Sequence, residues 1–168
     1  MTHQTTFDHE AATTALAQAL RQQGLKLATA ESCTGGLIAA ACTELAGSSD
    51  WFERGVVSYS NEAKTELLGV PEALIARHGA VSEPVALAMA EGALRHGKAQ
   101  VSVAVTGVAG PSGGSAAKPV GTVWFGFSLR GQTHSEVQRF DGNRAAVRQA
   151  TVTHALRRLL ELLGAHSG

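Results

Sequence analysis

This sequence has few cysteines and no spacing typical of metal ligands. Each of these absences argues against one kind of protein. The chain of 168 residues has only two cysteines, Cys33 and Cys42, which do not form a CxxC pair. A disulfide framework is therefore not expected. The seven histidines are scattered, without HxxxH or HExxH spacing, so the sequence predicts neither a metal site nor a metal cofactor.

An excess of one charge and a long apolar run are also missing. The 14 basic and 14 acidic residues balance, which gives no reason to expect a nucleic acid or an anionic membrane as partner. No apolar stretch approaches the roughly 20 residues that span a bilayer. The N-terminal segment MTHQTTFDHEAATT lacks the basic and apolar regions of a signal peptide, so a cytoplasmic location is expected.

Enough apolar residues are present for a folded core. The sequence is 44% apolar and 17% charged, which is typical of a globular protein and not of a disordered one. A chain of this length forms one domain more readily than two. We therefore expect one domain over residues 1–168, with residues 1–7 as a loose end.

Periodicity and turn residues divide the chain into alternating helices and strands. The predicted helices cover residues 8–23, a segment that starts between 33 and 36 and ends near 47, 61–69 with Asn61 as N-cap, 71–79, 82–97 and about 143–163. The predicted strands cover residues 25–30, 54–60, 101–107, 122–129 and 133–140, the last two as an antiparallel hairpin. This order predicts the α/β class: a single three-layer α/β/α domain with a mixed, mostly parallel sheet.

Two loops rich in hydroxyl groups and glycine directly follow predicted strands. They are ESCTGG at 31–36 and TGVAGPSGG at 106–114. Ligand sites of open α/β sheets lie outside the carboxyl ends of the strands, so we expect both loops at the same edge of the sheet. Tyr59 and Ser60, at the end of a third strand, could join them.

Ser32 is the first candidate for chemistry, because it lies between a strand and a helix. Unpaired backbone N–H groups at such a turn, from Cys33 and Thr34, can stabilise an oxyanion, and Gly35 and Gly36 allow close approach of the backbone. The alternative is that Ser32 or Thr34 merely caps the helix, and the residues alone leave this open. Cys33 competes as a nucleophile, although we interpret it as a small packing residue.

A serine nucleophile needs a base, and no histidine follows a strand in an equivalent position. His78 lies near a predicted helix end and is interpreted as a surface residue. Lys64, five residues after Tyr59, could serve if burial or a nearby positive charge lowers its pKa. The alternative is an ordinary solvated lysine. Tyr59 could relay a proton or position a substrate.

Candidates for anion binding come from the second loop and from the last helix. The backbone amides of the loop, including those of Thr106, Gly107 and Gly110, could cradle a phosphate, although the loop is not a Walker A motif. Arg144 and Arg148 lie near the start of the last helix, where cations oppose the helix dipole. That position favours an anion-binding role only slightly over that of an ordinary solvated arginine.

Six ordered segments resemble one known family. They are AESCTGG, GSSDWFERGVVSYSNEAKTELLGV, HGAVSEPVA, VTGVAGPSGG, KPVGTVWFGF and DGNRAAVRQATV. Together they are similar to the CinA C-terminal domain family in its stand-alone form, over about residues 10–163. The resemblance implies hydrolysis of the carboxamide of nicotinamide mononucleotide to nicotinate mononucleotide and ammonia, without a metal or other cofactor.

The resemblance also implies roles for particular residues. The family's motif serine, lysine and tyrosine fall on Ser32, Lys64 and Tyr59, which implies acyl transfer by a Ser–Lys pair. The groups that we expect around the oxyanion and the substrate, including its phosphate, are Cys33, Thr34, Gly35, Gly36, Thr106, Gly107, Gly110, Arg144 and Arg148, with Arg54 as a weaker phosphate candidate.

One rival interpretation and one assembly state complete the expectations. The rival is a non-catalytic module that binds a pyridine nucleotide or phosphate, and the presence of Ser32, Tyr59 and Lys64 favours the enzyme over it. The hairpin at 122–140, the apolar last helix and the family resemblance predict a homo-oligomer, a dimer or larger.

Overall fold

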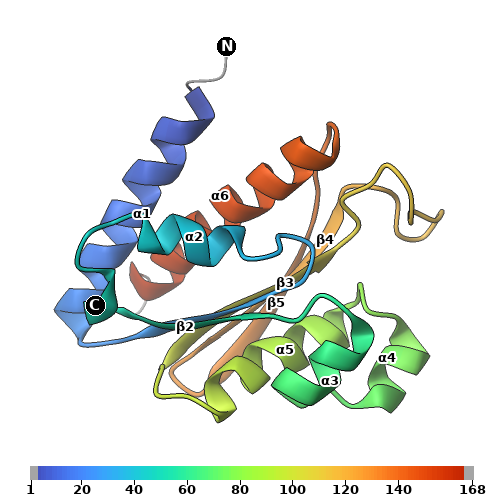
Figure 1. Cartoon of the computed structure of the whole chain (residues 1–168), viewed down its shortest axis with the longest axis horizontal. Coiled ribbons are helices and arrows are strands. Elements are labelled where there is room, and N and C mark those ends of the chain that lie inside the picture. Colours follow the sequence, from blue (N-terminus) through green and yellow to red (C-terminus); the bar gives the residue numbers. More distant parts are fainter. Residues whose placement is uncertain (1–3, 165–168) are drawn as a thin grey trace.

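A five-stranded sheet forms the middle layer of the protein (Figure 1). The structure is a computed structural model, and it describes residues 4–164. The strands are β1 (Leu27–Glu31), β2 (Phe52–Val57), β3 (Val101–Gly107), β4 (Thr122–Leu129) and β5 (Gln132–Arg139). The helices are α1 (Gln4–Gln23), α2 (Leu37–Thr43), α3 (Asn61–Leu68), α4 (Glu72–His78), α5 (Glu83–Arg95) and α6 (Arg144–Gly164), with a short 3₁₀ turn, η1, at Ser48–Asp50.

The strand order in the sheet is β2-β1-β3-β4-β5. β1 runs parallel to both of its neighbours, β2 and β3, whereas β4 is antiparallel to β3 and to β5. The sheet is therefore mixed, as predicted. β4 alone, among the strands within residues 4–164, runs against the others, and it carries the predicted hairpin to β5.

The burial of each strand follows its place in the sheet. β1 and β3 lie inside the sheet, and all residues of β1 and all but the last of β3 are buried. Parallel strands need cover on both faces, which explains why their sequences are nearly continuous apolar runs. β5 is an outer strand, and exposed residues alternate along most of its length with partly buried ones.

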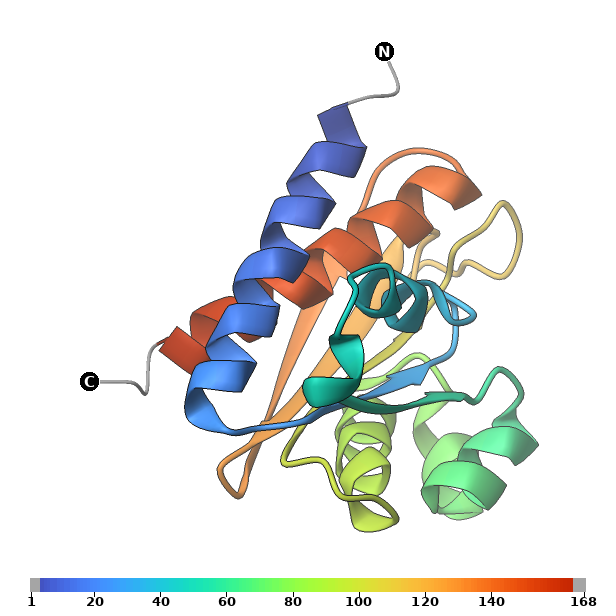
Figure 2. The same cartoon turned by 60° about the vertical axis from the view of Figure 1, so that its left-hand side comes forward.

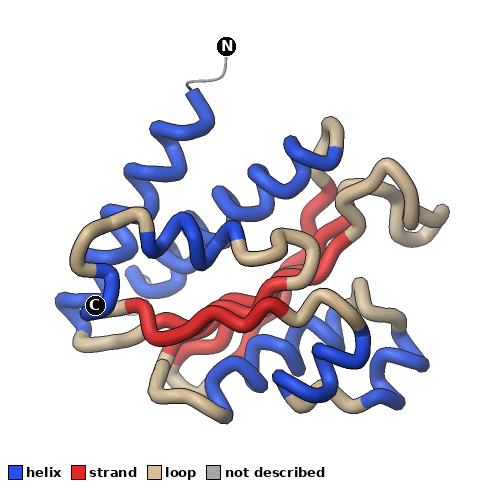
Figure 3. Tube along the Cα trace, in the orientation of Figure 1, coloured by secondary structure: helices blue, strands red, loops and turns tan. Residues whose placement is uncertain are grey.

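Two groups of helices cover the two faces of the sheet (Figure 3). α1, α2 and α6 pack on one face, and α3, α4 and α5 pack on the other. Each face has its own apolar cluster: Leu16, Trp51 and Leu156 belong to the first, and Leu68 and Met89 belong to the second. The predicted single α/β/α domain of three layers is confirmed.

α1 and α6, the first and the last helix, lie against each other (Figure 2). Leu16 and Leu20 of α1 are fully buried in the same cluster as Leu156 and Leu159 of α6. Residues three and four positions apart share one face of a helix, so each helix presents an apolar stripe to the other. The two helices therefore depend on each other for burial.

Three helix boundaries differ from the prediction. α1 begins at Gln4, so residues 4–7 of the predicted loose end are helical; residues 1–3 lie outside the described part of the chain. α2 starts at Leu37, just after the predicted start at 33–36, and ends at Thr43, before the predicted end near 47. Ser60, not Asn61, caps α3, since its Oγ accepts a hydrogen bond from the amide of Ala63 at 3.0 Å.

Candidate active site

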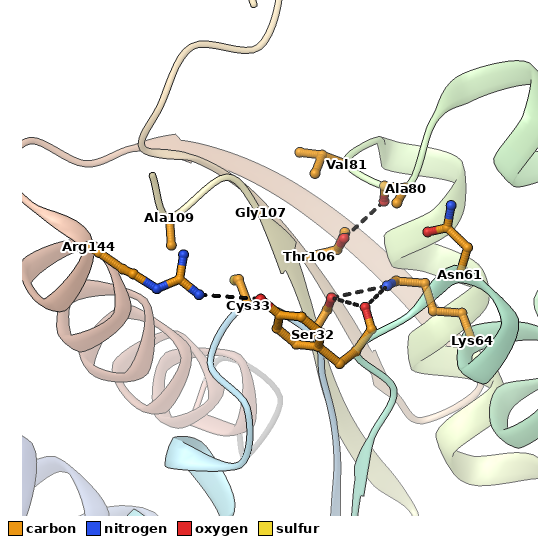
Figure 4. Close-up of a pocket in the computed structure, with 11 residues that line it drawn as sticks. Ser32, Cys33, Asn61, Lys64, Ala80, Val81, Thr106, Gly107, Ala109 and Arg144 are labelled. Atoms are coloured by element: carbon orange, nitrogen blue, oxygen red, sulfur yellow. Dashed lines mark hydrogen bonds between the residues drawn. The ribbon is translucent and has the colours of Figure 1, made fainter. Parts of the chain in front are cut away.

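The carboxyl ends of three parallel strands meet at one edge of the sheet. Glu31, the last residue of β1, pairs with Val57 of β2 and with Val105 of β3, so the segments that follow these strands converge, as predicted. A pocket of about 230 Å³ opens there (Figure 4). Its lining residues are Ser32, Cys33, Tyr59, Asn61, Lys64, Ala80, Val81, Thr106, Gly107, Ala109 and Arg144.

Ser32 lies in a tight turn between β1 and α2. Its own amide donates to the Val105 carbonyl at 3.1 Å, which ties the turn to β3, and its carbonyl accepts from the amide of Gly35 at 3.0 Å. Gly35 and Gly36 have φ angles of 59° and 109°, a region that residues with a Cβ rarely adopt. These glycines end the turn and let α2 begin at Leu37.

Glu31 holds this turn in place from within the protein. Its buried carboxylate accepts hydrogen bonds from the amides of Ile38 at 2.8 Å and Ala39 at 3.0 Å, in the first turn of α2, and from the hydroxyl of Thr34. Glu31 therefore shapes the turn and caps α2 from the preceding strand. Neither Ser32 nor Thr34 caps α2 directly, so the capping alternative for Ser32 is wrong.

Lys64 approaches Ser32 from α3, on the opposite face of the sheet from α2 (Figure 4). Its side chain is only 1% exposed. The Nζ atom lies 3.0 Å from Ser32 Oγ and 3.1 Å from the backbone carbonyl oxygen of Tyr59. The alternative of a solvated helix lysine is therefore wrong, and the structure brings together the two side chains that the sequence singled out.

Burial controls the charge of Lys64. Loss of hydration lowers the pKa of the Lys64 ammonium below its ordinary value of 10.5, since burial disfavours the charged form. Within residues 4–164 no carboxylate forms an ion pair with it. A neutral amine has two N–H groups and one lone pair. The carbonyls of Tyr59 and Ser60, at 3.1 and 3.5 Å, can take the N–H groups and leave the lone pair for the Ser32 hydroxyl.

Tyr59 contributes to the site through two different groups. Its backbone carbonyl contacts Lys64, and it lies 3.4 Å from Ser32 Oγ. Its side chain is 60% exposed, and its phenol oxygen accepts a hydrogen bond from Arg144 Nη2 at 3.3 Å. The contact with the lysine therefore comes from the backbone, which differs from the expectation of a phenol placed to relay a proton.

Cys33 lines the pocket beside Ser32 but is protected from ionisation. The residue is 6% exposed, and burial raises the pKa of its thiol to about 11. Burial likewise raises the pKa of Cys42 to about 12. Because the thiolate is the reactive form of cysteine, this environment agrees with the interpretation of Cys33 as a packing residue.

The three candidate arginines have three different environments. Arg144 lines the pocket and donates from Nη1 to the Gly110 carbonyl at 2.9 Å. Arg148, one helical turn further along α6, donates to the backbone carbonyls of Cys33 and Thr34 and does not line the pocket. Arg54 donates to Glu53 and to the carbonyl of His96, which follows α5 and lies away from the strand ends, so its candidacy for phosphate is wrong.

The second glycine loop contributes its first residues to the pocket. Thr106 and Gly107 line it, and Thr106 Oγ1 donates to the Ala80 carbonyl at 2.9 Å, which ties β3 to the segment before α5. Several predicted site residues do not line the pocket: Thr34, Gly35, Gly36, Gly110 and Arg148.

Sequence reasoning missed four lining residues: Asn61, Ala80, Val81 and Ala109. Asn61 carried a usable signal, because a residue three positions before Lys64 shares its helix face. The other three are small apolar residues, and nothing in their type indicates a site.

Two features are absent from the described part of the chain. Residues 4–164 contain no group of three or more His, Cys, Asp or Glu side chains that could hold a metal ion. In the same range, no helix combines the length and the apolar character needed to cross a membrane.

A serine and a buried lysine thus face each other at the strand ends of a three-layer fold, which defines an α/β protein with a Ser–Lys site. The chain belongs to the CinA C-terminal domain family, whose sequence model matches residues 9–163.

Two curated relatives are similar to this chain over most of their length. The chain is 53% identical over 143 residues to nicotinamide-nucleotide amidohydrolase PncC of Escherichia coli strain K12, which covers 84% of this chain and 87% of the relative. It is 54% identical over 149 residues to the protein of the same name from Pseudomonas putida, with coverage of 89% and 93%.

Solved structures agree with the fold. A CinA superfamily protein from Klebsiella pneumoniae 700603 superimposes with a TM-score of 0.90 at 41% identity, covering 94% of this chain and 98% of its own. The competence/damage inducible protein CihA from Agrobacterium tumefaciens gives a TM-score of 0.89 at 46% identity, with coverage of 94% and 96%.

Proposed function

We propose that this protein hydrolyses the carboxamide of nicotinamide mononucleotide to nicotinate mononucleotide and ammonia, with Ser32 as nucleophile and Lys64 as base. The observation that carries the proposal is the 3.0 Å contact between Lys64 Nζ and Ser32 Oγ, made by a lysine whose pKa is lowered by burial. The names of the relatives supply the substrate.

In the first step, the neutral Lys64 amine takes the proton of the Ser32 hydroxyl while Oγ attacks the amide carbon. The carbonyls of Tyr59 and Ser60 hold the Lys64 amine. Its lone pair is therefore already directed at the Ser32 hydroxyl. A nucleophile and base within hydrogen-bond reach satisfy the first geometric condition of acyl transfer.

The tetrahedral intermediate carries a negative oxygen that needs donors. The amides of Cys33 and Thr34, in the turn that follows Ser32, donate to no other backbone oxygen within residues 4–164 and are our candidates for this oxyanion site. Protonated Lys64 then passes its proton to the leaving nitrogen, and ammonia departs. Water, deprotonated by Lys64, hydrolyses the acyl-enzyme and releases the nicotinate nucleotide.

Arg144 is the proposed partner of the substrate phosphate. It enters the pocket from α6, whereas Lys64 enters from α3, and the two side chains flank Ser32 from opposite sides (Figure 4). This separation lets one end of a nucleotide meet a fixed cation while its carboxamide meets the serine. Arg guanidinium groups bind phosphate through charge-assisted hydrogen bonds.

The experiment measures ammonia release from nicotinamide mononucleotide by the purified protein in the presence of EDTA, with Ser32→Ala as the matched variant. We expect release by the wild type and a loss of at least about a thousandfold in the variant, because the nucleophile is gone. Binding of the nucleotide without release by the wild type would instead favour the non-catalytic module. Activity lost only on addition of EDTA would point to a metal-dependent hydrolase.

We also propose a homo-oligomer, a dimer or larger, and a cytoplasmic location. The apolar stripe of α6 does not support assembly, because it is buried within the chain. The open edge of β5, with Val137 at 43% exposure, is what now supports it.

A further inference from the structure

Arg148 binds the turn that carries Ser32 (residues 32–36) and does not line the pocket. Its Nε atom donates to the Cys33 carbonyl at 3.1 Å, and its Nη2 atom donates to the Thr34 carbonyl at 3.1 Å. A Cβ atom on Gly35 would lie 3.5 Å from Nη2, so the guanidinium rests against the turn itself. The donors of this side chain therefore point at the backbone that carries Ser32, not at a substrate.

The same turn has occupied carbonyls and unoccupied amides. The Ser32 carbonyl accepts from Gly35 and the Thr34 carbonyl also accepts from Leu37, while Arg148 holds that of Cys33. Within residues 4–164, the amides of Cys33 and Thr34 donate to no backbone oxygen. In a planar trans peptide the C=O and N–H groups point in opposite directions, so whatever fixes the carbonyls also fixes these two amides.

We infer that Arg148 is a positioning residue for the oxyanion site. Its bond to the Cys33 carbonyl orients and polarises the Thr34 amide, which belongs to the same peptide. Its bond to the Thr34 carbonyl acts on the Cys33 amide one step further away, because that carbonyl shares a peptide with the Gly35 amide, and the Gly35 amide donates to the Ser32 carbonyl. The inference rests on the proposed function. A cation at the carbonyl end of aligned peptides reinforces their dipole. A hydrogen bond to a carbonyl also strengthens its neighbours in a chain, by roughly 10–30% per bond.

The charge of Arg148 is free to act on the turn. No carboxylate within residues 4–164 forms an ion pair with it. The backbone path of the turn also has an independent anchor, because Glu31 holds the amides of Ile38 and Ala39 and the hydroxyl of Thr34. Loss of Arg148 should therefore leave the turn in place and mainly alter the direction and strength of its free amides.

The test uses a small fluorophosphonate that phosphonylates serine, with labelling of Ser32 followed by mass spectrometry. Ser32 Oγ forms a bond to phosphorus, the P–F bond breaks, fluoride leaves, and Lys64 takes the hydroxyl proton. The phosphoryl oxygen then occupies the oxyanion position, so the rate reports on the amides without any nicotinamide nucleotide. We expect Arg148→Ala to slow labelling about 10- to 100-fold, less than the roughly 100- to 1,000-fold loss of an oxyanion donor itself.

Two comparisons separate positioning from mere stability. Added guanidinium ion at millimolar concentration should restore part of the Arg148→Ala rate, and in turnover of nicotinamide mononucleotide kcat should fall while KM changes less than about twofold. The matched control is Arg158→Ala, which removes an α6 arginine that pairs with Glu136 away from the pocket. This control should lose thermal stability without a change in labelling rate.

Each outcome has a definite meaning. A wild-type labelling rate in Arg148→Ala, or a loss that guanidinium does not rescue, overturns the inference. Normal labelling of the wild type without ammonia release would contradict the proposal that nicotinamide mononucleotide is the substrate. The effect of Arg148→Ala on labelling would still test the inference. A wild type that is not labelled at Ser32 overturns both the inference and the serine mechanism.

Discussion

Lys64 is an ionisable group whose side chain is almost completely removed from bulk solvent. Its side chain is 1% exposed, and its neighbours are a hydroxyl and two carbonyl oxygens. These groups can accept from an ammonium but cannot neutralise its charge. At the scale of the residue, burial without a carboxylate partner makes the charged form of Lys64 unfavourable in the folded protein. The same burial prepares Lys64 to act as a base.

The first prediction follows from the direction of this pKa shift. Because the folded-state pKa of Lys64 lies below 10.5, the unfolded chain binds more protons than the folded one between the two values, and stability rises with pH there. Lys64→Met removes the penalty. We expect it to raise Tm at pH 7, by about 2–4 °C for each kcal/mol gained, with a gain that shrinks as pH approaches 10.5.

Activity should show the complementary behaviour. In the wild type, kcat/KM should rise with pH as Lys64 loses its proton, with an apparent pKa below 10.5, and Lys64→Met should be inactive. Lys64→Arg is the control that keeps a cation but cannot lose its proton at these pH values. A Tm for Lys64→Met below that of the wild type at every pH would contradict the account of burial.

The second prediction concerns Arg144 and the phosphate. Arg144→Ala removes one charge-assisted contact, worth roughly 1.5–3 kcal/mol, so KM for nicotinamide mononucleotide should rise about 10- to 100-fold. Nicotinamide riboside, which lacks the phosphate, is the matched substrate. Its kinetics should be nearly equal in wild type and variant. An equal loss with both substrates would show that Arg144 acts by holding Gly110 and Tyr59 and does not bind phosphate.

Sequence reasoning at this scale worked where position along a strand was the signal. Ser32 and Lys64 were identifiable because each follows a strand whose end had to reach the same edge of the sheet. By contrast, the sequence could not predict that the carbonyl of Tyr59 contacts Lys64 while its phenol contacts Arg144. Residue type does not show whether the backbone or the side chain of a residue is used. Arg148 was expected to contact the substrate. Its actual partners, the carbonyls of Cys33 and Thr34, could not be predicted, because backbone groups carry no sequence signature.

At the scale of elements, α3 and α5 approach each other unusually closely at Gly92. A Cβ atom at this position would lie 2.0 Å from the carbonyl oxygen of Leu68, the last residue of α3. Only glycine allows this approach, and α3 is the helix that delivers Lys64. The spacing of these two helices is therefore linked to the position of the base.

The third prediction opposes two known effects of glycine-to-alanine substitution in a helix. Gly92→Ala gains roughly 0.5–1 kcal/mol of helix propensity, but overpacking against a backbone carbonyl costs roughly 1–3 kcal/mol. We expect a lower Tm and reduced activity, because α3 must move. Glu91→Ala, at an exposed position of the same helix, is the control and should be neutral. A higher Tm for Gly92→Ala would mean that α3 yields without cost.

Element types could be predicted from the sequence, whereas three helix boundaries could not. Alternating periodicity located the strands and helices, including the hairpin of β4 and β5. The start of α2 was missed because its cap comes from Glu31, a carboxylate on the preceding strand that reaches Ile38 and Ala39. Local capping rules look for a serine, threonine, aspartate or asparagine directly before the helix, and a cap from a strand several residues away falls outside them.

At the scale of the whole molecule, the fourth prediction is the assembly state. The outer strand β5 leaves backbone N–H and C=O groups at the edge of the sheet, and such edges pair readily with other strands. We expect light scattering after size exclusion to give at least twice the monomer mass of 17.3 kDa. Val137→Lys, on that edge, should lower the mass without lowering kcat. A wild-type mass of 17.3 kDa at micromolar concentration would exclude the oligomer.

α6 has a consequence for the order in which the protein is made. It buries α1 and supplies both Arg144 and Arg148, yet it is the last helix of the described chain to leave a ribosome that adds about 5–20 residues per second. A nascent chain therefore holds Ser32 and Lys64 for several seconds before the rest of the pocket exists. During that time the apolar face of α1 has no partner and is open to chaperones. Catalytic competence should arrive in one event, after α6 has left the ribosome and packed against α1.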